Sequence, residues 1–120
     1  GVLVTQATSP FYATDAFWCI ANTVAASTIS SAGGRLYALP YRASVPSFGE
    51  WGFVMGALRP LSPGRARLAS TISTRYLTAE LLPSMFLFPR DIARRETPIN
   101  RLDNQVLVRL YEKGYKRYNK

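Results

Sequence analysis

The sequence predicts an α/β fold, and three observations support this. Residues 1 to 7 form a short apolar run with β-branched side chains, and Phe17, Ile20, Ala21 and Val24 recur at helical spacing. Two strand-like runs, separated by a tight Pro/Gly turn, then follow. The predicted order is therefore strand, helix, strand, turn and strand. At 120 residues the chain suits one domain with a modest core.

The first strand and the helix are the best-marked local elements. Because residues 1 to 7 are almost wholly apolar, we expect a strand that is covered on both faces, as strands of a parallel sheet are. Thr14 can cap the helix, and Asp15 would then lie at the positive end of the helix dipole. Gly33 and Gly34 are expected to end this helix.

The next two strands are expected over residues 36 to 45, with an interruption near Pro40, and over residues 51 to 58. The turn between them, residues 46 to 50, is far shorter than the crossover that parallel strands need. The two strands should therefore pair in antiparallel fashion.

The chain beyond these strands is expected to alternate between loops and short helices. Residues 59 to 75 are rich in Pro, Gly, Ser and Arg and are typical of a loop. Residues 78 to 85 indicate a short helix, and residues 89 to 99 a polar connector.

A final helix is predicted from Leu102, Val106 and Leu110, which recur at fourfold spacing. Asn100 is its expected cap and Gly114 its expected stop, so residues 115 to 120 should form a frayed tail.

The net charge of +8 is concentrated in the last quarter of the chain. Residues 90 to 120 hold nine Lys or Arg and four Asp or Glu, a local charge of +5. A solvated helix face is the favoured interpretation, and a nucleic-acid footprint or a patch facing anionic lipid are the alternatives. Nucleic-acid binding through Tyr115 and Tyr118 is the weakest of these, because no aromatic platform accompanies the basic residues on a predicted sheet.

The scarcity of metal-binding and nucleophilic residues excludes whole reaction classes. With no histidine and one cysteine, the sequence cannot supply a Cys/His metal cluster, a Ser-His-Asp triad, an imidazole base or an intrachain disulfide. An unpaired Cys19 in a predicted helix favours a reducing, cytoplasmic setting. The apolar runs are far shorter than the roughly 20 residues of a spanning helix, so the chain itself is expected to be soluble.

Two motifs carry a resemblance to a known family. Val-Pro-Ser-Phe-Gly-Glu-Trp-Gly-Phe occupies residues 45 to 53, and Val-Thr-Gln-Ala-Thr-Ser-Pro occupies residues 4 to 10, ahead of Phe-Trp-Cys at residues 17 to 19. With these motifs the chain resembles the C-terminal half of a spermidine synthase, a polyamine aminopropyltransferase, from the bacterial branch with an N-terminal membrane domain.

This resemblance implies a fold and a division of the chain. Residues 1 to 58 would be the C-terminal half of a Rossmann-like, methyltransferase-type domain whose sheet ends in an antiparallel strand. Residues 59 to 120 would be a loop and helical C-terminal extension.

The resemblance also implies a reaction, the transfer of an aminopropyl group from decarboxylated S-adenosylmethionine to putrescine. In the family a glycine-rich loop binds the donor and an aspartate acts on the amine, and both would lie in the missing N-terminal half. We therefore expect no catalytic, cofactor-binding or metal-binding residue in this chain, and no activity from it alone. Its expected partners are the missing N-terminal half, putrescine or a similar amine, and further copies of itself. Nucleic acid is not an expected partner, and contact with a membrane is expected only through a domain outside this chain.

Gln6 and Trp51 are the main candidates for the amine site. The resemblance places Gln6 where the family has a glutamine that hydrogen-bonds the amine, and a neutral amide can accept a proton without fixing the amine as ammonium. It places Trp51 on the wall of the diamine channel, where an aromatic face attracts ammonium groups. The alternatives are a Gln6 that hydrogen-bonds the following loop and a core Trp51, although Gly49 and Gly52 suggest room for a ligand.

Glu50 is a second candidate, for the distal ammonium of the diamine. If the strand begins by Gly49, Glu50 and Trp51 point to opposite faces and line different walls, which leaves Glu50 as a solvated turn residue. Short synthases carry a substrate-binding tyrosine where this sequence has Pro46, with Phe48 nearby, so the preferred amine stays open.

A function of a different class also fits the sequence. The chain would then be a noncatalytic interaction module that derives from the same fold and docks through its basic C-terminal helix. Arg59 and Arg75, which flank the loop, would meet a membrane, a partner or solvent.

Overall fold

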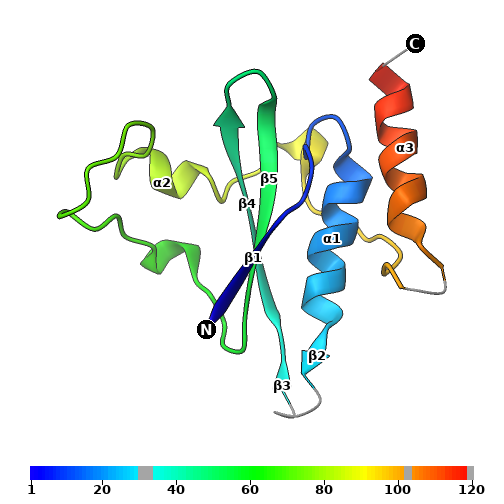
Figure 1. The fold of residues 1–120 in the computed structure, drawn as a ribbon, viewed down its shortest axis with the longest axis horizontal. Helices are drawn as coiled ribbons and strands as arrows, with labels where there is room; N and C mark the ends of the chain where they lie inside the picture. The colour runs from blue at the N-terminus through cyan, green and yellow to red at the C-terminus, as the bar shows by residue number, and fades with distance from the viewer. Residues whose placement is uncertain (30–33, 102–103, 119–120) are drawn as a thin grey trace.

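A three-stranded antiparallel sheet with one helix packed on it forms the centre of the computed structural model, which describes residues 1–29, 34–101 and 104–118. The sheet has the order β1 (Val2–Gln6), β5 (Gly49–Ala57), β4 (Tyr37–Val45), and α1 (Thr14–Ala26) packs against β4 and β5 (Figure 1). The prediction of an α/β fold is thus confirmed, as is the antiparallel pairing across the turn at residues 46 to 48.

The first strand differs from the prediction. β1 pairs with β5 in antiparallel fashion and lies at an edge of the sheet, and its apolar side chains Val2, Leu3 and Val4 are 43% to 54% exposed. The expectation of a strand covered on both faces is therefore wrong for the described residues. The physical reason is its position: α1 covers mainly β4 and β5, so an apolar composition alone did not ensure burial.

Strand β4 runs without a break through Pro40, which pairs with Val54, so the predicted interruption is wrong. β4 is the other edge strand of the sheet. The Arg42 N–H, two residues on, points away from β5 and donates to the Met85 carbonyl. A proline whose missing N–H faces that outer edge costs no ladder hydrogen bond.

Helix α1 begins and ends differently from the prediction. Its N-cap is Ala13, and the Thr14 hydroxyl instead donates to the Pro10 carbonyl. The Ser9 hydroxyl accepts hydrogen bonds from the N–H groups of Phe11 and Tyr12. The chain leaves the helix after Ala26 and enters the short hairpin β2 (Thr28–Ile29) and β3 (Gly34–Arg35). Gly34 thus lies in a strand, and Gly33 lies outside the described residues.

The core forms where α1 meets the sheet. Phe17, Trp18 and Ala21 are buried against Ala7 and Val54. The predicted connector, residues 89 to 99, runs along α1 and contains the short 3-10 helix η2 (Arg90–Ile92). The Trp18 indole N–H donates to the buried Ile92 carbonyl at 2.9 Å, and Asn22 donates to the Arg95 carbonyl.

The segment between the sheet and the connector is mostly irregular, as predicted. It contains the 3-10 helix η1 (Pro63–Arg65) and the short helix α2 (Leu81–Ser84), which is briefer than the helix expected over residues 78 to 85.

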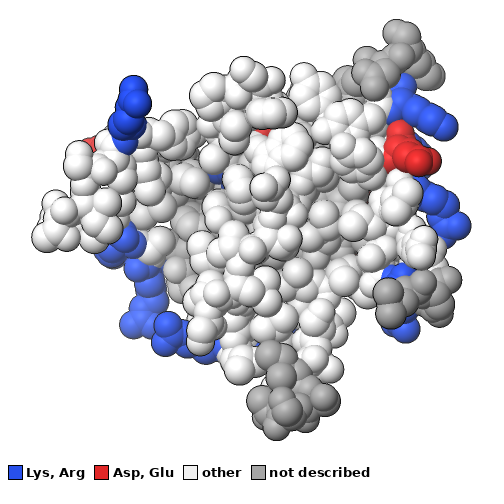
Figure 2. Space-filling model, in the orientation of Figure 1, with Lys and Arg blue, Asp and Glu red and all other residues white. Residues whose placement is uncertain are grey.

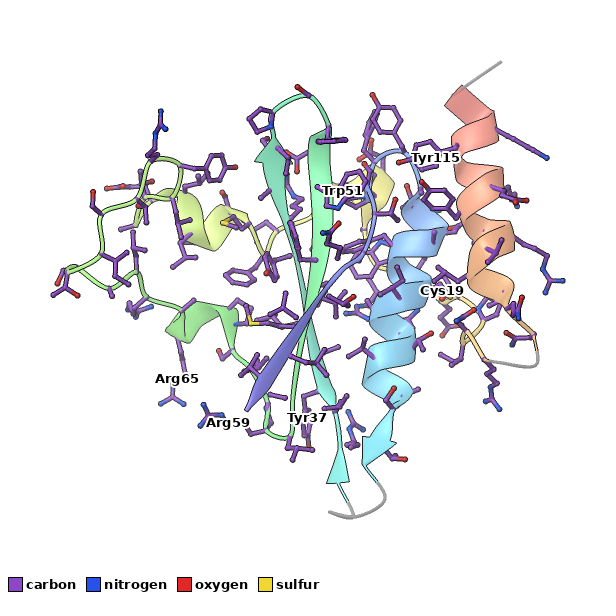
Figure 3. The ribbon with its side chains drawn as sticks, viewed as in Figure 1. Cys19, Tyr37, Trp51, Arg59, Arg65 and Tyr115 are labelled. Atoms are coloured by element: carbon purple, nitrogen blue, oxygen red, sulfur yellow. The ribbon has the colours of Figure 1, made fainter. Side chains whose placement is uncertain are left out.

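The final helix, α3 (Val106–Tyr118), packs against α1. Gly114 is not its stop: a Cβ at this glycine would lie 2.8 Å from the Ala13 Cα, so Gly114 permits the close approach of α3 to the start of α1. Tyr115 stacks on Tyr12 from this helix (Figure 3). Leu102 of the predicted apolar spacing lies outside the described residues.

The cap of α3 also differs from the prediction. The Asn104 side-chain oxygen accepts a hydrogen bond from the Val106 N–H at the start of the helix. The side-chain oxygen of Asn100, which lies six residues before the helix, accepts one from the Leu107 N–H. Lys and Arg side chains gather at the edge of the molecule formed by α3 (Figure 2). Within the described part of the chain, every helix is too short or too polar to cross a membrane.

Candidate functional site

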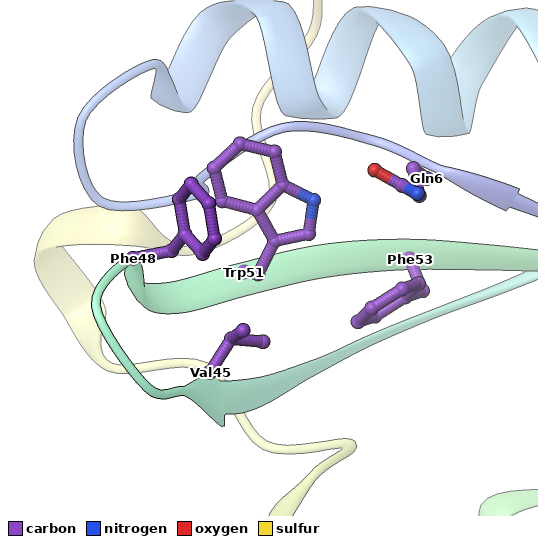
Figure 4. A pocket seen from close by; sticks show the side chains of 5 residues that line it. All are labelled: Gln6, Val45, Phe48, Trp51 and Phe53. Atoms are coloured by element: carbon purple, nitrogen blue, oxygen red, sulfur yellow. The ribbon is translucent and has the colours of Figure 1, made fainter.

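A pocket of about 400 Å³ opens where β1 ends beside the turn between β4 and β5 (Figure 4). Its lining residues come from all three strands and the turn: Gln6, Val45, Phe48, Trp51 and Phe53. Gln6 pairs with Phe53 in the sheet register, and Trp51 follows on the same face of β5 because alternate residues of a strand share a face. Sheet register therefore brings together residues that are more than 40 positions apart in the chain.

The aromatic side chains of the pocket support one another. The rings of Phe48 and Trp51 meet edge to face with centroids 5.8 Å apart, and Phe53 stacks on Tyr41 at 5.3 Å. Burial raises the pKa of the Tyr41 phenol above its ordinary value, so this ring stays neutral behind Phe53. The result is an apolar wall with aromatic faces.

Gln6 supplies the polar group of this pocket. Its carboxamide lies beside Trp51 in Figure 4, and no hydrogen bond from it to another described residue is found. An amide in this state keeps both its acceptor oxygen and its donor N–H₂ for a ligand. The pocket thus combines apolar walls, aromatic faces and one neutral hydrogen-bonding group. Such a set suits an elongated amine, whose methylenes pack on the rings and whose ammonium group lies over an indole.

Glu50 does not line this pocket. It pairs with Ser44 on the other face of the strand, accepts a hydrogen bond from the Ser44 hydroxyl and forms an ion pair with Arg42 at 3.0 Å. β5 begins at Gly49, so Glu50 and Trp51 do point to opposite faces. Glu50 stabilises the β4–β5 hairpin.

Gly52 does not leave space for a ligand. A Cβ at this position would lie 2.3 Å from the Phe17 Cε1, so the Phe17 ring fills the space that the glycine leaves. Gly49, with a φ of 76°, instead allows the backbone to leave the turn. Trp51 is half-buried, whereas Trp18 is the tryptophan of the core.

Backbone hydrogen bonds fix Gln6 relative to Trp51. The Ala7 N–H donates to the Gly52 carbonyl at 2.9 Å, and the Gly52 N–H donates to the Thr8 carbonyl at 2.7 Å. Thr8 has a φ of 57°, which is rare for a β-branched residue. The sequence pattern did not identify Phe53 as a site residue, although its spacing of two from Trp51 in a strand was a usable signal.

The described residues contain no group of three His, Cys, Asp or Glu side chains that could hold a metal ion. Cys19 lies in the core, its thiol donates to the Pro98 carbonyl, and desolvation raises its pKa above the ordinary value of 9.0. A thiol in this state is protonated at neutral pH and is a poor nucleophile.

Sequence comparison relates this chain to a class of transferases. It is 43% identical over 119 residues to polyamine aminopropyltransferases 1 and 2 of Ralstonia nicotianae, and 41% identical over 116 residues to a polyamine aminopropyltransferase of Leptospira interrogans. These matches cover 96% to 97% of this chain and 20% to 21% of the relatives. No protein-family profile and no solved structure matches the chain.

The chain is therefore homologous to polyamine aminopropyltransferases. It spans about a fifth of the length of the curated relatives that it matches. The family resemblance inferred from the two motifs is thus confirmed.

Proposed function

We propose that this chain is part of a spermidine synthase-like enzyme that transfers an aminopropyl group from decarboxylated S-adenosylmethionine to putrescine, and that it supplies the amine side of the site. The observation that carries the proposal is the pocket in which Gln6 and Trp51 meet, in a chain homologous to polyamine aminopropyltransferases. The roles of both residues rest on the family resemblance and on this geometry.

The reaction sets the demands on such a pocket. The nitrogen of an unprotonated amine attacks the carbon beside the donor's sulfonium, a C–N bond forms, and the C–S bond breaks with its electron pair going to sulfur. The new ammonium group then releases one proton. The protein must hold the diamine, accept a proton and align the nitrogen with the carbon.

The residues present can perform the first and last of these tasks. Trp51 and Phe48 would contact the methylenes, and an ammonium over the indole would be stabilised by about 0.5 to 2 kcal/mol. The Gln6 oxygen would accept a hydrogen bond from the attacking amine and orient its lone pair. Among the described residues, no carboxylate lines the pocket. We therefore assign the proton acceptor and the donor site to parts of a longer protein outside this chain, which alone would be inactive.

We also propose that the sheet is the end of a Rossmann-like, methyltransferase-type sheet, with residues 1 to 58 in that domain and residues 59 to 120 as its extension. Two observations support this. β5 is antiparallel to both neighbours, and β1 pairs with β5 alone among the described strands, so its other edge is available to a further strand. A cytoplasmic location is proposed from the unpaired thiol of Cys19.

The test is steady-state kinetics of the full-length protein with Trp51→Ala and Gln6→Ala. Trp51→Ala should lower kcat/KM for putrescine by about 1 to 3 kcal/mol, roughly 5- to 150-fold, with the donor KM unchanged. Gln6→Ala should lower kcat while the free energy of unfolding stays within about 1 kcal/mol.

Tyr37→Ala is a matched control, because Tyr37 is an aromatic on the same strand pair at the end away from the pocket, opposite Ala57. It should leave both kinetic constants unchanged. A loss confined to the donor KM would remove Trp51 from the amine site. Absence of transfer by the unmutated protein would favour the alternative, an interaction module that docks through α3, where Val108 is 56% exposed.

A further inference from the structure

A second pocket of about 400 Å³ lies on the same face of the sheet, further along β4 and β5 from the Gln6–Trp51 pocket. Leu39 and Met55, which are paired in the sheet, form its floor together with Phe86. The chain from Arg59 to Ala66 forms the opposite wall. The pocket therefore has an apolar floor and is bordered on one side by a basic loop.

Arg59 and Arg65 are the arginines among the described residues that line this pocket. Both residues are exposed, and both side chains extend outward from the same end of the sheet in Figure 3. The ion pairs found in the described part of the chain involve neither of them. The sequence from residue 51 to residue 79 contains four arginines and no Asp or Glu. Figure 2 correspondingly shows Lys and Arg, with no acidic side chain, along the edge of the molecule where Figure 3 places Arg59 and Arg65.

This combination selects a class of ligand. Guanidinium groups bind phosphate and carboxylate through paired N–H donors, and they attract anions more strongly where no acidic side chain competes. The apolar floor contributes by burying hydrocarbon surface. The positive charge of these arginines disfavours a polyamine here, and the two pockets share no lining residue.

We propose that this pocket binds an amphiphilic organic anion. Its phosphate or carboxylate head pairs with Arg59 and Arg65, and its alkyl or aromatic body lies against Leu39, Met55 and Phe86. A volume of about 400 Å³ lies within the range of small-ligand sites. The same chemistry is offered by a free metabolite and by the headgroup region of an anionic lipid.

The first experiment is calorimetric titration of the full-length protein with hexyl phosphate. Inorganic phosphate serves as the head without the body, and hexylammonium as the body with the opposite charge. Hexyl phosphate should bind, inorganic phosphate should bind at least about tenfold more weakly, and hexylammonium should give no heat. Equal binding of hexyl phosphate and hexylammonium, or no binding of hexyl phosphate, would overturn the proposal.

Variants then place the binding in the pocket. Arg59→Gln and Arg65→Gln should each weaken hexyl phosphate binding about tenfold or more, because each removes a charged donor to the head. Arg75→Gln is the matched control, since it removes the same charge from the same acid-free segment but is not among the lining residues. Melting temperatures should agree among all three variants. If Arg75→Gln lost as much affinity for hexyl phosphate, the effect would come from overall charge, and the proposal of a specific site in this pocket would be refuted.

Vesicles separate the two sources of the ligand. Phosphatidylcholine vesicles containing phosphatidic acid are added as competitors of hexyl phosphate, with pure phosphatidylcholine vesicles as the reference. If the anionic vesicles compete with hexyl phosphate and this competition is lost in Arg59→Gln, the result supports the proposal, with a lipid headgroup as the ligand. Binding of hexyl phosphate without such competition supports the pocket with a free anion as occupant.

Discussion

Replacement of Gly52 by alanine should destabilise the protein and disturb the candidate amine site together. The new Cβ would lie 2.3 and 2.4 Å from two atoms of the Phe17 ring and 2.8 Å from the Thr8 carbonyl oxygen. Carbon atoms in contact are normally about 3.5 Å or more apart, so the ring would have to move by about 1.2 Å.

The surroundings of Phe17 resist such a movement. The ring is fully buried, and it contacts the rings of Trp18 at 4.8 Å and Phe88 at 5.5 Å. Overpacking of a core costs about 1 to 3 kcal/mol and sometimes more, whereas the reduced freedom of the unfolded chain returns about 0.4 to 1 kcal/mol. We expect a net loss of about 1 to 2 kcal/mol in the free energy of unfolding.

Urea unfolding measures this loss, with Gly64→Ala as the control. The nearest atom to a Cβ at Gly64 is the Ser62 hydroxyl oxygen at 3.9 Å, so this variant should stay within about 0.5 kcal/mol of the parent. Adding Phe17→Leu to Gly52→Ala should cost less than the sum of the two single changes, because the smaller side chain relieves the overlap. Equal stabilities of Gly52→Ala and Gly64→Ala would refute the packing argument.

Three further outcomes are expected. Trp18→Phe leaves the buried Ile92 carbonyl without its 2.9 Å donor and should lower the free energy of unfolding by about 1 to 3 kcal/mol in urea titrations; a neutral result would mean that the bond contributes nothing. Glu50→Gln, which weakens the half-exposed pair with Arg42, should cost no more than about 1 kcal/mol and leave kcat/KM for putrescine unchanged, whereas a tenfold kinetic loss would make Glu50 a substrate residue. The pKa of Cys19 is raised in the folded protein, so the unfolded chain loses the thiol proton at lower pH, and the free energy of unfolding should fall as pH rises above 9.0. Melting temperatures measured against pH should therefore fall more steeply for the parent than for Cys19→Ala. Identical pH profiles would contradict this.

Local patterns predicted the hairpin well. The turn after Val45 is too short for any connection but an antiparallel one, and the structure pairs Val45 with Gly49. The alternation that separates Glu50 from Trp51 also followed from sequence, once the strand start was assumed.

Features that depend on distant contacts were not predictable. Gly52 and Gly114 both looked like local signals, one for ligand space and one for a helix end, yet each permits a close approach by another element, Phe17 and Ala13 respectively. Pro40 looked like a break because its edge position is visible only in the assembled sheet.

The candidate site was predicted in part. Gln6 and Trp51 were identified through family resemblance, and the register of β1 with β5 explains their proximity. Phe53 was missed although its spacing of two from Trp51 places both on one face of the strand, whereas its pairing with Gln6, 47 positions earlier, is visible only in the structure.

The central claim, that a diamine binds between Gln6 and Trp51, can be observed directly by ¹⁹F NMR. The sequence contains two tryptophans, so full-length protein labelled with 5-fluorotryptophan reports on Trp51 in the pocket and on Trp18 in the core. Trp18→Phe identifies which resonance belongs to each.

Titration with putrescine should shift the Trp51 resonance with saturation and leave the Trp18 resonance in place, because the Trp18 indole is buried and bonded to Ile92. Gln6→Ala should weaken the apparent affinity of this response. A saturating shift of Trp18 with none at Trp51, or no shift of either resonance at putrescine concentrations that support transfer, would contradict the assignment of the amine site.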